Sequence, residues 1–151
     1  MARYVVSVRS PLPADKAFAY MADLGNFAEW DPGVNEVTQV EGDAPGLDAA
    51  YDVAINAVPS DIVLRYHIIT FEPDDRLVAK AVGRIFTSVD VITVVPEGDG
   101  SVVTYDAELT FSGFLGVANP VLGLVFDRVG DKAAAGLIEA LEGERVEEPT
   151  S

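Results

Sequence analysis

The chain contains no cysteine, which excludes disulfide bonds, thiolate chemistry and zinc or iron–sulfur sites held by cysteine. Its single histidine and its scattered acids show no helical i, i+4 ligand spacing, so no metal site is predicted. No uninterrupted apolar run reaches the roughly 18 residues needed to span a bilayer, and the N-terminal residues lack the pattern of a leader sequence. These absences predict a soluble, cytoplasmic protein without a metal or cofactor.

Basic residues are also scarce. The chain has 10 lysine and arginine residues against 25 aspartate and glutamate residues, which gives a formal net charge of -15. Such an acidic protein repels phosphate backbones, and no basic stripe reverses the charge locally, so DNA and RNA are not expected partners. Hydrophobic residues make up 49% of the 151 residues, enough for a compact single domain.

Alternation of apolar and polar side chains predicts that most of the chain is strand. Residues 3–9 place Tyr4, Val6 and Val8 on one face, as in a half-buried strand. Similar runs follow and are separated by short turn sequences such as GDAPG and EPDD, so we expect an antiparallel meander. The further strands are predicted at residues 34–41, 49–58, 61–71, 76–83, 84–95 and 102–111.

Helical spacing of apolar residues occurs after the first strand and again after the last. Residues 14–22 form one short predicted helix, and residues 27–30 allow one more turn before the sequence DPG ends it. A long helix is predicted from Pro120 to about Glu142. We therefore expect a single domain over residues 1–143 and a disordered tail over residues 144–151.

These elements predict the architecture. A twisted meander curls, and its concave side has to be covered. Only the C-terminal helix is long enough to cover it, so we predict an α+β fold with a curved seven-stranded antiparallel sheet around a long C-terminal helix and two short helices after the first strand. The unequal strands pack imperfectly against the helix, so a cavity between the sheet and the C-terminal helix is expected, where a ligand would bind.

Two segments resemble a known family. Residues 10–37, SPLPADKAFAYMADLGNFAEWDPGVNEV, have a proline-led helix followed by Asp-Leu, Asn, Trp and Pro. They resemble the helix-grip superfamily (SRPBCC, or START-like), which includes START lipid-transfer domains, birch-pollen-allergen-like proteins, coenzyme-Q-binding proteins and polyketide cyclases. Residues 100–113, GSVVTYDAELTFSG, are similar to its polyketide cyclase and dehydrase branch.

The resemblance implies a pocket for a lipid, sterol, quinone or polyketide-like molecule, and hence a carrier or sensor. It does not by itself imply catalysis, because the same fold serves several functions. One alternative is a polyketide or steroid-type cyclase or dehydratase. Another is a regulatory or toxin-like interaction protein with a reduced cavity.

The only tryptophan, Trp30, lies on a connector. An indole there buries on the order of 200 Å², either as structural filling or as one end of the cavity. Tyr51, Tyr66 and Tyr105 are in phase with apolar neighbours, which points their hydroxyls into the interior, as core residues or as groups that orient a ligand. The residues predicted to line the cavity are Trp30, Tyr51, Val53, Ile55, Tyr66, Ile68, Tyr105, Leu109, Phe111, Phe126, Val129 and Ala133.

The candidate catalytic residues are His67, Arg65 and Asp90. Arg65 and His67 share one face of a strand, and together they would supply a base and a cation. The opposite face of this strand suits the interior better, which turns both side chains into water. Because both faces carry apolar residues, the sequence leaves the inverted orientation open, in which Arg65 and His67 are the leading catalytic pair. Asp90 is in phase with apolar Ile92 and Val94; buried, it becomes a candidate acid or base, although an exposed or salt-bridged position is more common for an aspartate.

The first turns of the C-terminal helix are apolar almost all round. Val121 and Leu124 fall near the side that is polar further along the helix. This patch is interpreted either as the cavity mouth, as a transient membrane contact or as a homodimer contact. The alternative is that a neighbouring loop of the same chain covers it.

Overall fold

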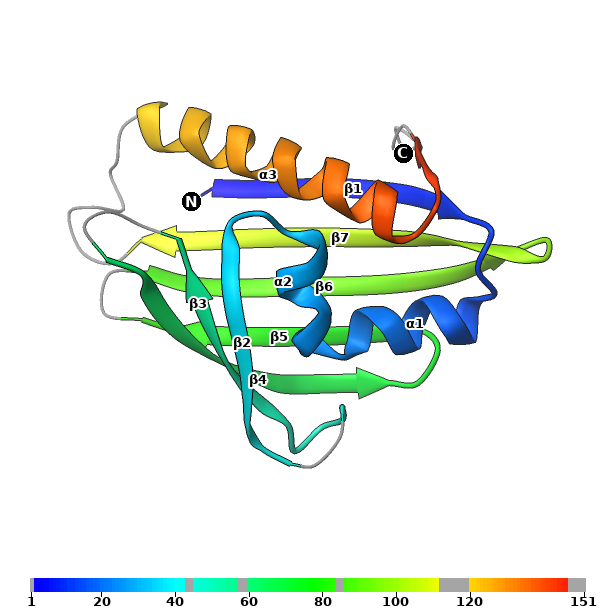
Figure 1. Cartoon of the computed structure of the whole chain (residues 1–151), viewed down its shortest axis with the longest axis horizontal. Coiled ribbons are helices and arrows are strands. Elements are labelled where there is room, and N and C mark those ends of the chain that lie inside the picture. The colour runs from blue at the N-terminus through cyan, green and yellow to red at the C-terminus, as the bar shows by residue number, and fades with distance from the viewer. Residues whose placement is uncertain (1, 43–44, 57–59, 84–85, 112–119, 147–151) are drawn as a thin grey trace.

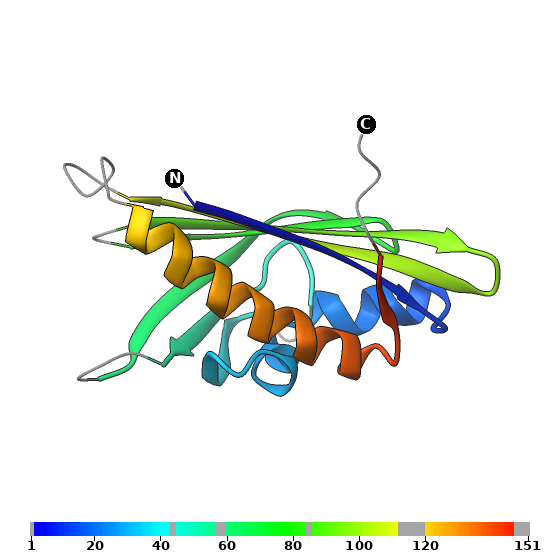
Figure 2. The same ribbon diagram turned by 90° about the horizontal axis from the view of Figure 1, so that it is seen from above.

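The computed structural model describes residues 2–42, 45–56, 60–83, 86–111 and 120–146, and of residues 2, 86, 111 and 120–129 it describes only the backbone. The fold is a single antiparallel sheet with helices on one side (Figures 1 and 2). The strand order in the sheet is β2-β3-β4-β5-β6-β7-β1-β8. Strands β2 to β7 form the expected meander, and β7 returns to pair with the N-terminal strand β1.

The strands are β1 (Ala2–Ser10), β2 (Val34–Glu41), β3 (Ala50–Ile55), β4 (Ile62–Glu72), β5 (Arg76–Val82), β6 (Phe86–Glu97), β7 (Gly100–Phe111) and β8 (Glu144–Val146). The helices are α1 (Ala14–Ala22), the 3-10 turn η1 (Leu24–Asn26), α2 (Phe27–Trp30) and α3 (Pro120–Ala140). None of the described helices is both long and apolar enough to cross a membrane.

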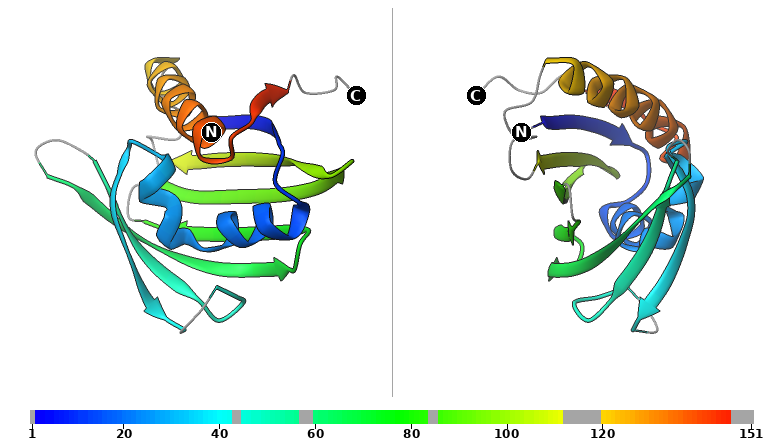
Figure 3. Two further views of the ribbon diagram at one scale, coloured as in Figure 1. Left: turned by 45° about the vertical axis from the view of Figure 1, so that its right-hand side comes forward. Right: turned by 90° about the vertical axis from the view of Figure 1, so that its left-hand side faces the viewer.

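The sheet is strongly curved, and α1 lies on its concave side (Figure 3). The segment from α1 to α2 covers β6 and β7 from that side, while α3 runs along β1 and touches α2. The concave face is the buried one, because alternate residues of each strand point to it. On β1, for example, Tyr4, Val6 and Val8 point inward and form part of the core.

Side-chain caps fix the connector between β1 and β2. Asp23 accepts a hydrogen bond from the backbone N–H of Gly25 at 2.9 Å, and the side-chain amide of Asn26 donates to the carbonyl of Tyr20 at 3.0 Å. Asp31 likewise accepts from the N–H of Gly33 at 2.8 Å. These short bonds satisfy backbone groups where the helices end, which holds Trp30 in a defined position.

Close backbone approach and polar contacts hold α3 against its neighbours. A Cβ atom at Gly136 would lie 1.8 Å from the carbonyl oxygen of Trp30, and one at Gly130 would lie 2.3 Å from the ring of Tyr4. The hydroxyl of Tyr4 donates to Asp131 at 2.7 Å, and that of Ser10 donates to the carbonyl of Leu141 at 2.7 Å. Because Gly130 and Gly136 lack a side chain, α3 packs directly on β1 and α2.

Three sequence-based expectations about the fold are corrected. Within the described part of the chain, the sheet has eight strands rather than seven, because residues 144–146, expected to begin a disordered tail, form β8 beside β1. The connector contains a 3-10 turn between its two short helices. Helix α3 ends at Ala140, slightly before the expected Glu142.

Candidate ligand-binding site

Small side chains occupy the centre of the concave face. Ala79 of β5 is the register partner of Asp90 on β6, which in turn pairs with Ala107 of β7. One pleat away, Ala81 pairs with Ser88. Because these residues have small side chains, there is space above the middle of the sheet. Larger side chains of neighbouring strands and helices occupy that space and surround the carboxyl group of Asp90.

Asp90 is the centre of a buried hydrogen-bond cluster. The hydroxyl of Tyr105 donates to its Oδ2 at 2.8 Å, and the hydroxyl of Ser88 donates to its Oδ1 at 3.3 Å. Ser88 in turn accepts from the hydroxyl of Tyr66 at 2.8 Å. Strands β4, β6 and β7 thus each contribute to one chain of polar groups that converges on the carboxyl group.

Burial governs the protonation of this cluster. Asp90 is only 3% exposed, and burial raises its pKa from an ordinary 3.8 to about 7, although the bonds from Tyr105 and Ser88 oppose the shift. Burial and the nearby Asp90 also raise the pKa of Tyr105 and of Tyr66, so both hydroxyls stay protonated. Asp90 therefore changes protonation near neutral pH while its partners remain donors.

Aromatic side chains close the site from the helical side. Trp30 stacks on Phe27 with ring centroids 4.7 Å apart, and it makes a T-shaped contact with Tyr105 at a centroid distance of 5.3 Å and an interplanar angle of 79°. Phe27 also contacts Tyr105 edge to face at 6.2 Å. Trp30 is therefore buried, and its ring packs against Tyr105 of the polar cluster.

A small cavity lies between this aromatic layer and the sheet. Its walls come from α1, η1 and α2 on one side and from β5 and β6 on the other, and Asp90 lies in the sheet wall. The space open to the centre of a water-sized sphere is about 10 Å³, which is room for about one water molecule. The lining residues are Met21, Asp23, Leu24, Phe27, Trp30, Ala79, Asp90 and Ile92.

Among the residues predicted to line the cavity, most of those whose side chains are described lie inside the fold. The buried ones are Trp30, Tyr51, Val53, Tyr66, Ile68, Tyr105 and Ala133; Ile55 and Leu109 are half-buried. Of these, Trp30 alone also lines the small cavity, which lies beneath α1 to α2 rather than beneath α3. The side chains of Phe111, Phe126 and Val129, and those of Val121 and Leu124 in the predicted contact patch, lie outside the described residues.

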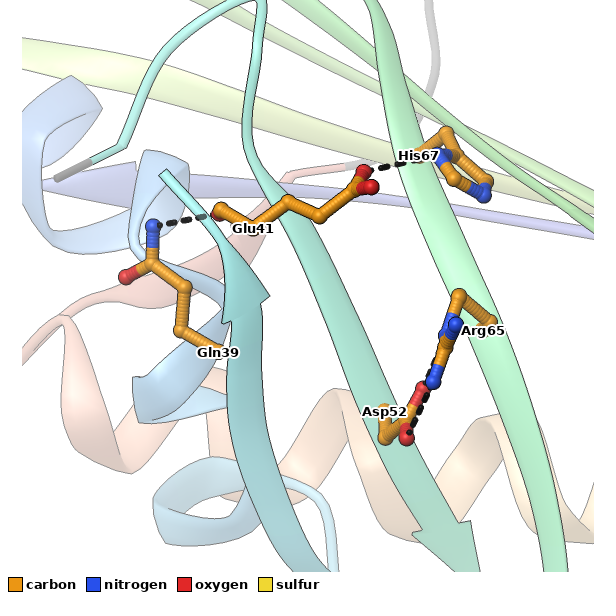
Figure 4. A network of polar contacts seen from close by, with 5 residues as sticks. All are labelled: Gln39, Glu41, Asp52, Arg65 and His67. Carbon is orange, nitrogen blue, oxygen red and sulfur yellow. Dashed lines mark hydrogen bonds and ion pairs between the residues drawn. The ribbon is translucent and has the colours of Figure 1, made fainter. Parts of the chain in front are cut away.

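The candidate pair Arg65 and His67 points away from the interior (Figure 4). On the outer face of the sheet, Arg65 donates to Asp52 of the neighbouring strand at 2.7 and 3.1 Å, and His67 Nδ1 lies 3.8 Å from Glu41. Arg65 also holds the pKa of Asp52 below its ordinary value. Of the three catalytic candidates, only Asp90 is therefore inside the fold.

Two features of the site are not evident from the strand pattern. Ser88 links Tyr66 to Asp90, although a serine in a strand carries no signal for this role. Asp23 and Leu24 line the cavity from the connector, where aspartate is read as a turn former. No group of three or more metal-ligating side chains occurs among the described residues.

The fold is shared with several known proteins. The structure is similar to a START superfamily protein from Mycobacterium smegmatis, with a TM-score of 0.76 and 12% sequence identity over 94% of this chain and 98% of that one. It is also similar to major latex-like protein 151 from Panax ginseng, with a TM-score of 0.62 and 13% identity over 87% of this chain and 93% of that one.

A third similar structure is the di-domain ARO/CYC StfQ from the steffimycin biosynthetic pathway, with a TM-score of 0.68 and 16% identity. The match covers 91% of this chain but 48% of that longer one. These likenesses confirm the helix-grip fold. No sequence among curated proteins matches the chain. The family model described as "Polyketide cyclase / dehydrase and lipid transport" matches residues 1–142, so the chain belongs to that family.

Proposed function

We propose that the protein binds a small hydrophobic molecule, such as a lipid, sterol, quinone or polyketide, between the concave face of its sheet and its helices. The observation that carries this proposal is the hydrogen-bonded cluster around Asp90 beside an interior cavity. A buried carboxyl group costs folding free energy that an apolar residue would not, so its presence supports a role in recognition.

Affinity comes from the burial of the guest. Apolar area contributes about 25 cal/mol for each Å² removed from water, and the polar cluster fixes the orientation of the guest. Because the cavity holds about one water molecule, a larger guest has to move the segment from α1 to α2 outward. That segment consists of short helices, and it reaches the sheet through side chains rather than through strand pairing.

A second candidate function is catalysis by the same cluster. A carboxyl group with a pKa of about 7 gives or takes a proton at neutral pH, as a cyclase or dehydratase requires. The di-domain ARO/CYC StfQ has the same fold, and the family description includes cyclases and dehydrases. In this function Asp90 is the acid or base, and Tyr105 positions its carboxyl group.

Native mass spectrometry of freshly purified protein, followed by solvent extraction, tests the binding proposal. We expect a single hydrophobic species that stays with the wild type and is reduced in Ala79→Val, which adds methyl groups to the cavity wall. Ala54→Val is the matched control, because it adds the same groups on the other face of β3. Equal amounts in both variants, or no bound species in the wild type, would contradict binding at this cavity.

The same extraction separates a carrier from an enzyme. Asp90→Asn keeps the size of the side chain but removes its titratable proton. If the protein is a carrier, the wild type and the variant release the same compound. If Asp90 catalyses a dehydration, the compound released by the variant is heavier by one water molecule than the compound released by the wild type.

A further inference from the structure

Tyr51 of β3 is fully buried, yet its hydroxyl group has no hydrogen-bond partner among the described residues. It lies on the concave face opposite Tyr66, its register partner on β4. The hydroxyl of Tyr66 is satisfied by Ser88, so the two neighbouring tyrosines differ in this respect. An unpaired buried hydroxyl is unfavourable, and most such groups in folded proteins have a partner.

Asp23 lines the cavity, and its charge also acts on the Tyr51 hydroxyl group. The Asp23 carboxylate lines the cavity beneath the aromatic layer. Burial, and to a lesser degree the negative charge of Asp23, raise the pKa of the Tyr51 phenol to about 12. Tyr51 therefore keeps its proton at neutral pH and is an available hydrogen-bond donor inside the fold.

The charges of the interior have one sign. The buried charged side chains among the described residues are Asp31 and Asp90, and Asp23 is half-buried at the cavity wall. Every described lysine, arginine and histidine side chain is exposed. A carboxylate or phosphate group that entered this interior would lose its hydration and meet only negative or neutral groups, which is strongly unfavourable.

We propose that Tyr51 determines ligand specificity by donating a hydrogen bond to an uncharged acceptor oxygen of the ligand, and that the acidic interior rejects carboxylate and phosphate amphiphiles. This inference rests on the proposed binding function and narrows its ligand class. The guest is an uncharged apolar molecule with a carbonyl or ether oxygen rather than a fatty acid anion or a phospholipid.

A series of three probes with one ring body tests the inference: naphthalene, 2-acetylnaphthalene and 2-naphthoate. Their affinities for the full chain are measured at pH 8 by NMR titration of the backbone amides. We expect 2-acetylnaphthalene to bind at least about tenfold more tightly than 2-naphthoate, because only the latter is an anion. In Tyr51→Phe, the affinity for 2-acetylnaphthalene falls by about fivefold, while that for naphthalene stays within about twofold.

Two controls separate specificity from folding. Tyr51→Phe removes an unpaired hydroxyl group, so the ligand-free variant should unfold at the same temperature as the wild type or a higher one. Tyr20→Phe removes a hydroxyl group that donates to Glu29 at 3.0 Å near the surface, and it should leave all probe affinities unchanged.

The possible failures are distinguishable. Equal affinities for 2-naphthoate and 2-acetylnaphthalene, or an unchanged affinity for 2-acetylnaphthalene in Tyr51→Phe, would overturn the specificity inference and leave the binding proposal intact. Failure of all three probes, naphthalene included, to perturb any amide of the interior would overturn both.

Discussion

Tyr105 donates a 2.8 Å hydrogen bond to Asp90 across the interface of β6 and β7, and both side chains are buried. The rings of Trp30 and Tyr105 form a T-shaped contact, so the aromatic layer and the carboxyl group are joined through one residue, Tyr105. A change in the protonation of Asp90 therefore acts on the bond that holds Tyr105 in place beneath Trp30.

The first prediction concerns stability and pH. The pKa of Asp90 is about 7 in the folded protein and an ordinary 3.8 in the unfolded chain, so the folded state holds the proton more tightly. The contribution of Asp90 to the free energy of unfolding is therefore most favourable below pH 4, and this contribution falls as the pH rises to about 7. At about 1.4 kcal/mol for each unit of pKa, the loss is on the order of 4 kcal/mol.

Urea unfolding between pH 4 and pH 8 measures this effect as the difference between the wild type and Asp90→Asn. We expect the stability of the wild type to fall relative to the variant over this range. Glu72→Gln, which removes an exposed carboxyl group, is the control and should keep the pH dependence of the wild type. Parallel curves for the wild type and Asp90→Asn would show that Asp90 has the same pKa in both states.

The second prediction concerns the contact between α2 and α3. Gly136→Ala would gain about 1 kcal/mol of helix propensity at an open site, but its Cβ would lie 1.8 Å from the carbonyl oxygen of Trp30. Because the Trp30 carbonyl belongs to the backbone and cannot rotate away, α2 has to shift. We therefore expect the free energy of unfolding, measured in urea, to fall by about 1 to 3 kcal/mol. Gly46→Ala, where nothing lies within 4 Å, is the control. A stabilised Gly136→Ala would contradict this close packing.

The strand pattern predicted which way most side chains point. Tyr51, Tyr66 and Tyr105 were placed inward because they alternate with polar residues, and the period of two is enforced wherever one face of a sheet is buried. Arg65 and His67 were assigned to water by the same rule, and they are exposed. Local alternation predicts the inward face where only one face of a strand is apolar. For residues 61–71, both faces carry apolar residues, so the sequence favours one orientation and the structure decides it.

The chemistry of the site depends on contacts between distant residues, which the pattern does not contain. Asp90 is in phase with apolar residues, but the general cost of a buried carboxyl group favoured an exposed position. It is tolerated inside because Tyr105 and Ser88 donate to it. Strand β8 was missed for a similar reason: its three residues form a strand only through pairing with β1.

The third prediction concerns Arg65 and His67, which point away from the interior. Arg65→Gln and His67→Ala remove the basic side chains on the outer face, where their partners are Asp52 and Glu41 (Figure 4). Since neither side chain reaches the interior, both variants should bind 2-acetylnaphthalene within about twofold of the wild type by NMR titration. A much larger loss in either variant, with the protein still folded, would mean that the outer face of β4 takes part in binding.

The fourth prediction uses Trp30 as the reporter of uptake, because it is the only tryptophan in the chain. Trp30 is 4% exposed and stacked on Phe27, so its fluorescence in the ligand-free protein should be blue-shifted and poorly quenched by acrylamide. A guest larger than one water molecule has to displace α2 from the sheet, since the cavity beneath it holds no more. Binding of a non-fluorescent uncharged guest, such as cyclohexyl methyl ketone, should therefore change both the emission maximum and the acrylamide quenching of Trp30.

Leu47→Ala, at an exposed position distant in sequence from α2, is the control and should respond as the wild type does. If the guest binds by NMR while the emission and quenching of Trp30 stay constant, α2 does not move, and the guest enters elsewhere in the fold.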